Sequence, residues 1–523
     1  MWQEKQLCAT LRLPKYVYPE LPLSQHIDDC APYIACHGFQ YSRITENDTS
    51  TERPEFQTEE EVAKAGHLSG LVPVNYQLYL GFPNDSHFEG SVNITFTVKY
   101  SAGKVTLNLG DTSPDILDHS SISITPACGK DRIIKPAAVN PPRMRCIQAA
   151  TYYVDQMSLV LQIRTPWFKE NSNYILSVPH FQGPIKVKQE YGFMRHARFR
   201  ERDARFMFPC FDHLSLKATF DLCIEYHERM MAVSNTPAIG SPQSISPIRN
   251  RQCFETTPVM STYSLQIVLL EKYEMESVAA EGQNLTIDLY AQKGSLNRIR
   301  WVANASIRII ELLEHAFNFT LPIRRQSVVL ARASSLMQSP GVIIMHWDSV
   351  ERVYSSTLNW LIVPKWIGNI VTVSYWDEIC LQEMLIQIYE VRLSRAIRNK
   401  EQITAAQPSL SGSRIPKKNE DSIYKGSCLS IYSIAYALEY AEGFETVDRF
   451  VAELLRKKAF ANANMADWNQ ALFEVTRKNG YKEYFTCKTQ QERVFSAAMC
   501  EMRVTSSRWR ANLDNLAILT WAI

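Results

Sequence analysis

Cys380 and Glu383 are the side chains whose types and spacing come closest to a metal site. They lie three residues apart in a segment with helical periodicity, so both would project from one helix face, and His346, the last histidine of the chain, precedes them. A catalytic zinc ion needs three protein ligands and one position open for water. One alternative is a zinc site built from these residues, but a lone Cys–Glu pair is more often structural, and we expect that here.

The elements that must position these residues divide the chain into three parts. Residues 1–68 form an N-terminal extension whose polar, acidic end predicts a linker. Residues 69–274 contain short segments in which polar and apolar residues alternate, and this pattern predicts one large antiparallel β domain. Residues 275–523 change to helical periodicity. Helices are expected at 298–317, 381–397, 427–440 and 445–458, strands near 327–330 and 341–345, and a loop at 400–422.

Composition restricts the class of protein. A chain of 523 residues is too long for one hydrophobic core, and a net charge of +2 gives no electrostatic case for a nucleic-acid partner. No apolar run approaches the roughly 18 residues of a membrane-spanning helix. Residues 1–15 lack the apolar core of a signal peptide. We therefore expect no membrane segment and no signal peptide in this chain.

Cysteines and glycosylation sequons give information about the cellular compartment of the protein. Twelve cysteines fit either reduced thiols or an ectodomain with a few bridges. Cys128 and Cys146 flank a Pro-rich loop, and both pairing and separate thiols remain open. Sequons make the chain a glycoprotein candidate. They begin at Asn47, Asn84, Asn93, Asn284, Asn304 and Asn318.

Motifs in the same order along the chain resemble those of the aminopeptidase N-like zinc metallopeptidases, the gluzincin aminopeptidases. Residues 73–78 (PVNYQL), 88–92 (FEGSV), 203–212 (DARFMFPCFD), 257–263 (TPVMSTY) and 368–372 (GNIVT) resemble the family's P-x-x-Y-x-L, F-x-G-x-V, D-A-R-R-A-F-P-C-F-D, T-P-x-M-S-T-Y and G-N-L-V-T. The resemblance implies an α+β multidomain fold. An N-terminal antiparallel β saddle domain would be followed by a mainly helical, thermolysin-like domain, which we expect to be truncated here.

The resemblance also implies the family's zinc motif, H-E-x-x-H, followed by Q-W-F and then by the G-N-L-V-T run that aligns with residues 368–372. The first histidine falls on Trp360, the general base on Leu361, the second histidine on Pro364 and the third ligand on Glu383. Indole and pyrrolidine offer zinc no lone pair, and an isobutyl group accepts no proton. Zinc is expected for the family, but two of three ligands are missing, so we predict no cofactor. We expect Glu383 to be solvated or salt-bridged, and the helix to be kinked at Pro364 or to begin there.

The family's G-A-M-E-N loop, whose glutamate holds the free amino group of a peptide, aligns with residues 335–339 (SLMQS). Met337 keeps its position, and Gln338 replaces the glutamate. A second acidic contact, in the family's Q-x-E-P segment, falls on Arg200, with Arg198 at the glutamine. The candidate ligand-binding residues are therefore Arg198, Arg200, Met337 and Gln338, in a pocket turned basic. Arg198 and Arg200 are equally compatible with two surface arginines on alternate strand positions.

The family's transition-state tyrosine lies two residues before a Lys-Gly pair. Here Ile423 occupies that position, and Tyr424 directly precedes Lys425. Tyr424 could serve only after a register shift, and we expect it to be an ordinary helix-face tyrosine.

These losses predict a catalytically inactive homologue of the zinc aminopeptidases that binds a peptide or a partner. Two alternatives are an active zinc-dependent aminopeptidase that releases N-terminal residues from peptides, and an interaction partner of an active aminopeptidase homologue. Family lineage suggests an extracellular or cell-surface location, which the missing signal and anchor leave unassigned.

Overall fold

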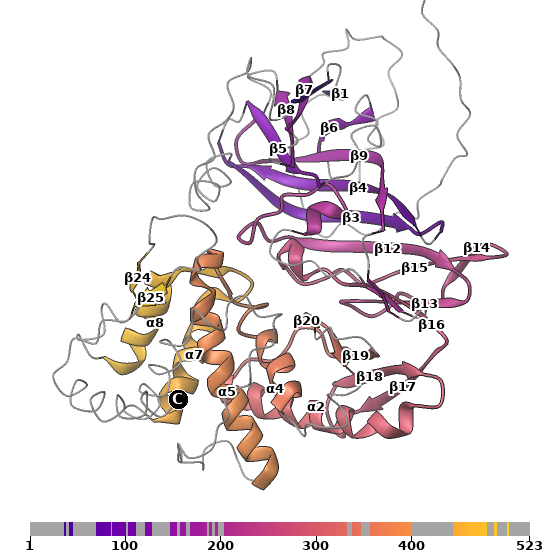
Figure 1. Cartoon of the computed structure of the whole chain (residues 1–523). Coiled ribbons are helices and arrows are strands. Elements are labelled where there is room, and N and C mark those ends of the chain that lie inside the picture. The colour runs from indigo at the N-terminus through magenta and orange to yellow at the C-terminus, as the bar shows by residue number, and fades with distance from the viewer. Residues whose placement is uncertain are drawn as a thin grey trace, which may run out of the picture.

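The computed structural model combines a sheet-rich part with a part that contains most of the helices (Figure 1). It describes residues 36–37, 41–44, 70–84, 86–100, 103–110, 121–127, 147–153, 157–163, 168–185, 188–190, 194–196, 203–331, 337–346, 356–399, 443–477, 486–488 and 499–501. The helix expected at 427–440 and the loop at 400–422 lie outside these residues. Among the helices described, none is both long and apolar enough to cross a membrane.

An eight-stranded sheet forms the centre of the first part. Its order is β1 (Cys36–His37), β6 (Ser123–Pro126), β9 (Ser172–Pro184), β4 (His87–Val98), β3 (Leu71–Gly81), β12 (Thr219–His227), β15 (Arg249–Cys253) and β14 (Gln243–Ser246). Side chains of β4 alternate between buried and half-buried along the strand, as the sequence pattern predicts. β3 and β12 run parallel, unlike the fully antiparallel domain expected, because a long crossover separates them in the chain.

Two four-stranded sheets complete this part. One contains β2 (Tyr41–Ile44), β7 (Ile147–Tyr153), β8 (Ser158–Ile163) and β5 (Lys104–Asn108), and the other contains β10 (Lys188–Glu190), β11 (Met194–His196), β16 (Ile267–Glu271) and β13 (Met230–Ser234). One cluster of buried apolar side chains contains residues of all three sheets, so they share a core.

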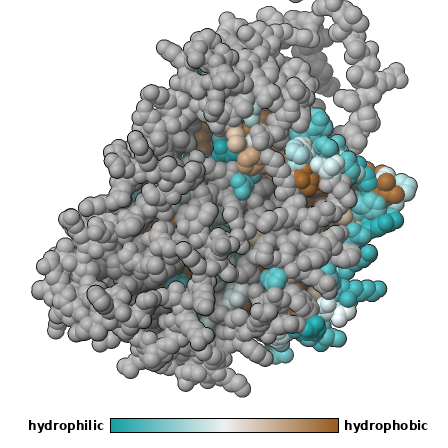
Figure 2. Space-filling view, in the orientation of Figure 1, coloured by the Kyte–Doolittle hydropathy of each residue, from teal (hydrophilic) through white to brown (hydrophobic). Residues whose placement is uncertain are grey.

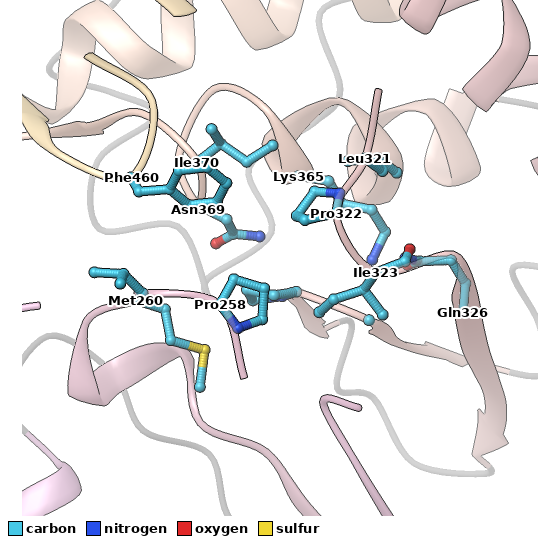
Figure 3. A pocket seen from close by; sticks show the side chains of 13 residues that line it. Pro258, Met260, Leu321, Pro322, Ile323, Gln326, Lys365, Asn369, Ile370 and Phe460 are labelled. Carbon is cyan, nitrogen blue, oxygen red and sulfur yellow. The ribbon is translucent and has the colours of Figure 1, made fainter. Parts of the chain in front are cut away.

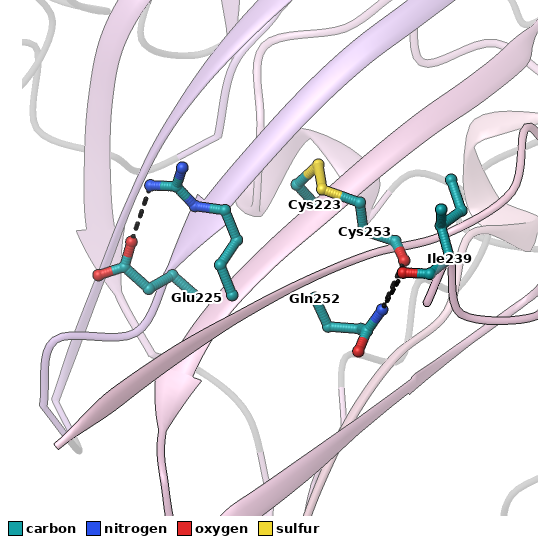
Figure 4. The surroundings of a disulfide bond; sticks show 6 residues. Cys223, Glu225, Ile239, Gln252 and Cys253 are labelled. Carbon is teal, nitrogen blue, oxygen red and sulfur yellow. Dashed lines mark hydrogen bonds and ion pairs between the residues drawn. A yellow bond between two sulfur atoms is a disulfide. The ribbon is translucent and has the colours of Figure 1, made fainter. Parts of the chain in front are cut away.

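A disulfide links Cys223 of β12 to Cys253 of β15, which are direct partners in the antiparallel register (Figure 4). Cys128 and Cys146 lie outside the described residues, so their pairing stays a prediction. The hairpin of β14 and β15 projects from the sheet edge (Figure 1), and some hydrophobic surface is visible there (Figure 2). Ile245 and Ile248 are exposed on this hairpin.

The second part begins with a five-stranded sheet and a long helix. The sheet order is β17 (Tyr273–Ala279), β18 (Thr286–Gln292), β19 (Arg325–Ala331), β21 (Val342–His346) and β20 (Met337–Ser339). The expected boundary at residue 274 falls inside β17. Helix α2 (Leu296–Phe317) buries side chains such as Ile299, Val302, Ile310 and Leu313, whose spacing matches the helical repeat. It ends at Asn318, which adopts a left-handed conformation.

Four more helices follow in the described part of the chain: α4 (Ser356–Ile362), α5 (Ile379–Asn399), α7 (Phe444–Lys458) and α8 (Met465–Thr476). Asn464 and Asp467 form a capping box at the start of α8. Short elements complete the description: 3-10 turns at Ala204–Phe206, Thr262–Ser264, Val363–Lys365 and Trp376–Glu378, and strands β22 (Thr372–Val373), β23 (Asn462–Ala463), β24 (Thr486–Lys488) and β25 (Met499–Glu501). The helices expected at 298–317, 381–397 and 445–458 and the strands expected near 327–330 and 341–345 are thus present, with ends that differ by one or two residues.

Candidate functional site

Helices α4 and α5 pack against each other. Glu383 lies on α5, and Trp360 and Leu361 lie on α4. The α-helical part of this segment ends at Ile362, and a 3-10 turn from Val363 to Lys365 contains Pro364 near its start. Proline lacks an N–H and clashes with the preceding turn, so the α-helix cannot continue through it. The helix was expected to kink at Pro364 or to begin there. Instead the α-helix ends at Ile362, and a 3-10 turn follows it.

Apolar surroundings enclose the positions that the resemblance assigns to a base and a metal. Leu361 is 0% exposed and belongs to the main apolar cluster, against which Trp360 packs. Pro364 is buried, and Glu383 is half-buried on α5. The described residues contain no group of three or more His, Cys, Asp or Glu side chains placed to hold a metal ion. The side chains at 360, 361 and 364 thus do not fit zinc, because none carries a ligand atom.

Gln338 lies beside this helix end. Its strand β20 pairs with β21, and its Oε1 accepts a hydrogen bond of 3.0 Å from Asn369 Nδ2. Met337 is buried. The structure therefore brings two predicted ligand-binding residues next to the turn that contains Pro364. Arg198, Arg200, Ile423 and Tyr424 lie outside the described residues, and their roles stay predictions.

Lys217 joins the sheet-rich part to the second part. Its Nζ donates to the backbone oxygens of Ala461 at 2.9 Å, Ile370 at 3.3 Å and Asn369 at 3.4 Å. Burial lowers the pKa of this amine to about 7. Three acceptors match the three donors of an ammonium group and favour its charged form. Sequence reasoning gave this lysine no role, although it lies only five residues after the family-like motif at 203–212.

Lys365 is a second buried amine, with fewer partners. Its Nζ donates to Ser339 O at 2.9 Å, and the residue is 2% exposed. Burial lowers its pKa to about 7. Lys365 stands where the family motif has a glutamine, so this change of residue type was the available signal, and sequence reasoning passed over it.

A small pocket with a cavity volume of about 20 Å³ lies between the two parts, and Lys365 lines it (Figure 3). Pro258 and Met260 come from the sheet-rich part. The second part contributes residues 321–323 and Gln326, the turn at Pro340 and Gly341, and Phe460, which follows α7. The pocket is mostly apolar, with Lys365, Gln326 and Asn369 as its polar side chains.

A protein-family model and several curated proteins match this chain. Residues 72–264 match the family model described as the Peptidase M1 N-terminal domain. The chain is 24% identical over 363 residues to aminopeptidase Q of Mus musculus, a match that covers 62% of each chain. It is 23% identical over 304 residues to endoplasmic reticulum aminopeptidase 2 of Homo sapiens, which covers 51% of this chain and 31% of the relative. Glutamyl aminopeptidase of Bitis rhinoceros is 25% identical over 310 residues, 53% of this chain and 32% of the relative. The chain thus spans less than two thirds of the length of these relatives.

Proposed function

We propose, from the premise that the chain is an M1 aminopeptidase-like family member, that it is catalytically inactive and acts by binding a peptide or a partner. The observation that carries this proposal is the set of side chains at 360, 361 and 364. A working site needs ligand atoms and a base there, because zinc lowers the pKa of its bound water and the base takes the proton.

The packing of α4, α5 and β20 supports the alignment of the family's ligand and base positions with residues 360, 361, 364 and 383. The family's chemistry requires the helix with the first two ligands to lie beside the helix with the third and beside the amine-binding strand. Here α4 packs on α5 and contacts β20. Leu361 is also part of the apolar core, so a glutamate at this position would need a partner or would remain protonated.

The experiment is zinc analysis of the purified chain after dialysis without chelator, together with hydrolysis of alanine amide. We expect less than stoichiometric zinc and no hydrolysis that a chelator abolishes. One tightly held zinc per chain, lost in Glu383→Ala and accompanied by chelator-sensitive hydrolysis, would overturn the proposal and support an active aminopeptidase. A triple variant, Trp360→His, Leu361→Glu and Pro364→His, serves as the positive control for regained zinc.

The binding role of the chain is supported by the charge change that the sequence predicts around Gln338. Gln338 and Arg200 would replace acidic groups, and Arg198 would replace a neutral glutamine. A peptide with an acidic N-terminal segment is therefore favoured over a free ammonium group. Fluorescence anisotropy with acidic and basic peptides of equal length tests this preference. Equal affinity for both, or no binding to either, would refute the peptide-binding role. Co-purification with an active aminopeptidase homologue would instead favour the partner role.

A further inference from the structure

Sequons for N-linked glycosylation have no part in the proposed function, and the fold separates them into two groups. Those within the described residues begin at Asn84, Asn93, Asn284, Asn304 and Asn318. A glycan is bulky and must project into solvent, so an acceptor sequon belongs in a surface loop of a protein that enters the secretory pathway. Three of these sequons lie at turns, and two lie inside regular elements.

Asn84 lies in a turn between β3 and β4 that the sequon itself builds. Its Oδ1 accepts hydrogen bonds of 2.9 Å from Ser86 N, Ser86 Oγ and His87 N. These are the contacts of an Asx turn, and they use the oxygen of the amide. Asn84 and Ser86 are both exposed. The turn therefore presents both functional residues of the sequon and does not use Nδ2, the atom that would carry the sugar.

Asn284 and Asn318 lie in two turns of the second part that share one ion pair. Asn284 is exposed in the turn between β17 and β18, and Asn318 is exposed where α2 ends. Arg324 Nε donates to Asn284 O at 3.1 Å, and Arg324 Nη1 pairs with Glu314. Glu314 O accepts from Asn318 N. Glycans at these two positions would therefore project from neighbouring turns.

The other two sequons lie inside a strand and a helix. Asn93 is half-buried in β4, which pairs with β3 on one side and with β9 on the other. Asn304 is exposed in the middle of α2, but the hydroxyl residue of its sequon, Ser306, is 1% exposed. An enzyme could use either sequon only before the element forms, because afterwards backbone hydrogen bonds would have to break. The three turns remain accessible during and after folding.

The Cys223–Cys253 disulfide is an independent observation that favours the same compartment. Disulfides persist in the ER lumen and outside the cell and are rare in the cytosol. Both cysteines are only half-buried, so packing would not protect the bond from cytosolic reductants.

We propose that Asn84, Asn284 and Asn318 carry N-linked glycans and that Asn93 and Asn304 do not. The donor is an oligosaccharide linked to a lipid diphosphate. Its transfer forms a bond from the asparagine Nδ2 to the anomeric carbon and breaks the bond from that carbon to the diphosphate. The diphosphate leaves with the electron pair, and the amide loses one proton.

Glycans at Asn284 and Asn318 would also restrict where a partner can bind. They shield the surface around the ion pair of Arg324 and Glu314, because a glycan is bulky and hydrated. A partner of this chain therefore binds at another surface.

The test maps glycans on the full chain purified from its natural source. Peptide N-glycosidase F in isotope-labelled water converts each glycosylated asparagine to a labelled aspartate, and mass spectrometry assigns the label to a residue. We expect label at Asn84, Asn284 and Asn318 and none at Asn93 or Asn304. Absence of label from all three turn positions would overturn the proposal.

Variants test each site separately in the full chain, secreted from cultured animal cells behind a cleavable leader. Asn84→Gln, Asn284→Gln and Asn318→Gln should each remove one glycan and increase electrophoretic mobility. Asn93→Gln and Asn304→Gln are the matched controls, which should leave mobility unchanged. Glycosylation of Asn93 or Asn304 as complete as that of the turn positions would refute the structural criterion.

If a variant is not secreted, peptide mapping of the unmodified chain still decides the outcome for its site. Neither experiment bears on zinc content or hydrolysis, so the glycosylation proposal fails or succeeds independently of the proposed function.

Discussion

At the scale of single residues, Lys365 has the most unusual environment among the described positions that the family motif covers. It replaces a glutamine with an amine that burial holds at a pKa of about 7, against an ordinary value of 10.5. Between these two pH values the unfolded chain binds a proton at this lysine and the folded chain does not. The free energy of unfolding must therefore rise with pH in this window.

The first prediction concerns this pH dependence. Lys365 should add about 1.4 kcal/mol of stability per pH unit from pH 7 upwards, while below pH 7 both states are protonated and the full burial cost remains. Urea unfolding of the natural chain and of Lys365→Met at pH 7 and pH 9 measures it. The difference in unfolding free energy between the two proteins should change with pH, and a constant difference would contradict the prediction.

Gly341 illustrates a requirement of backbone geometry. Its φ is +72°, and a Cβ added there would lie 1.7 Å from the backbone oxygen of Asn235. The Asn235 side chain also donates to Pro340 O at 2.8 Å, so this contact fixes the β20–β21 turn against the sheet-rich part. Glycine is needed for both the conformation and the close approach.

We predict that Gly341→Ala costs at least about 2 kcal/mol, from backbone strain and the clash together. Gly240→Ala is the matched control, because Gly240 has φ +63° and nothing lies within 4 Å of an added Cβ. That control should cost about 1 kcal/mol, from strain alone. Similar losses in the two variants, measured by urea unfolding, would show that the approach of Asn235 is unimportant.

At the scale of elements, a buried ion pair connects α5 to α7. Arg392 is 2% exposed and binds both oxygens of Asp448, at 2.8 and 3.1 Å. Tyr389 donates to Asp448 at 2.6 Å, and the Arg392 guanidinium lies over the rings of Tyr389 and Phe444. These contacts specify how two helices that are distant in the chain pack together.

Asp448→Ala should destabilise the protein by about 3–5 kcal/mol, because it leaves the Arg392 charge buried without its partner. The exposed pair of Arg456 and Glu453 on α7 gives the control Arg456→Ala, which should change stability little. Thermal unfolding of both variants tests the contrast. Equal effects would indicate that the α5–α7 pair is no more important than a surface pair.

At the scale of the whole molecule, several side chains of the sheet-rich part form hydrogen bonds with the second part. Lys217 reaches three backbone oxygens, Tyr263 donates to Gly368 O at 3.0 Å, and Asn235 holds the β20–β21 turn. Tyr263 and Gly368 belong to two of the family-like motifs. Residues of these motifs therefore connect the two parts, which is a structural role and does not depend on catalysis.

Lys217→Met should weaken this connection, because it leaves carbonyl groups at the junction without their donor. We expect a lower Tm and a calorimetric transition that broadens or splits into two. Lys293→Met, at an exposed position, is the control. A single sharp transition at the original Tm would show that Lys217 does not couple the two parts.

Two features follow from residue type and local periodicity. The absence of ligand atoms at Trp360, Leu361 and Pro364 is a property of their side chains, and helix α7 follows from apolar spacing along one segment. Neither requires knowledge of what lies nearby in space. Both were therefore predictable from the sequence.

Tertiary structure alone decided the burial of Lys365, the parallel pairing of β3 with β12 and the Cys223–Cys253 bridge. Lys217 makes the same point, because one of its acceptors, Ala461, lies 244 residues away in the chain. Desolvation and hydrogen bonding depend on which groups packing brings together. Local sequence patterns carry little information about contacts over such separations.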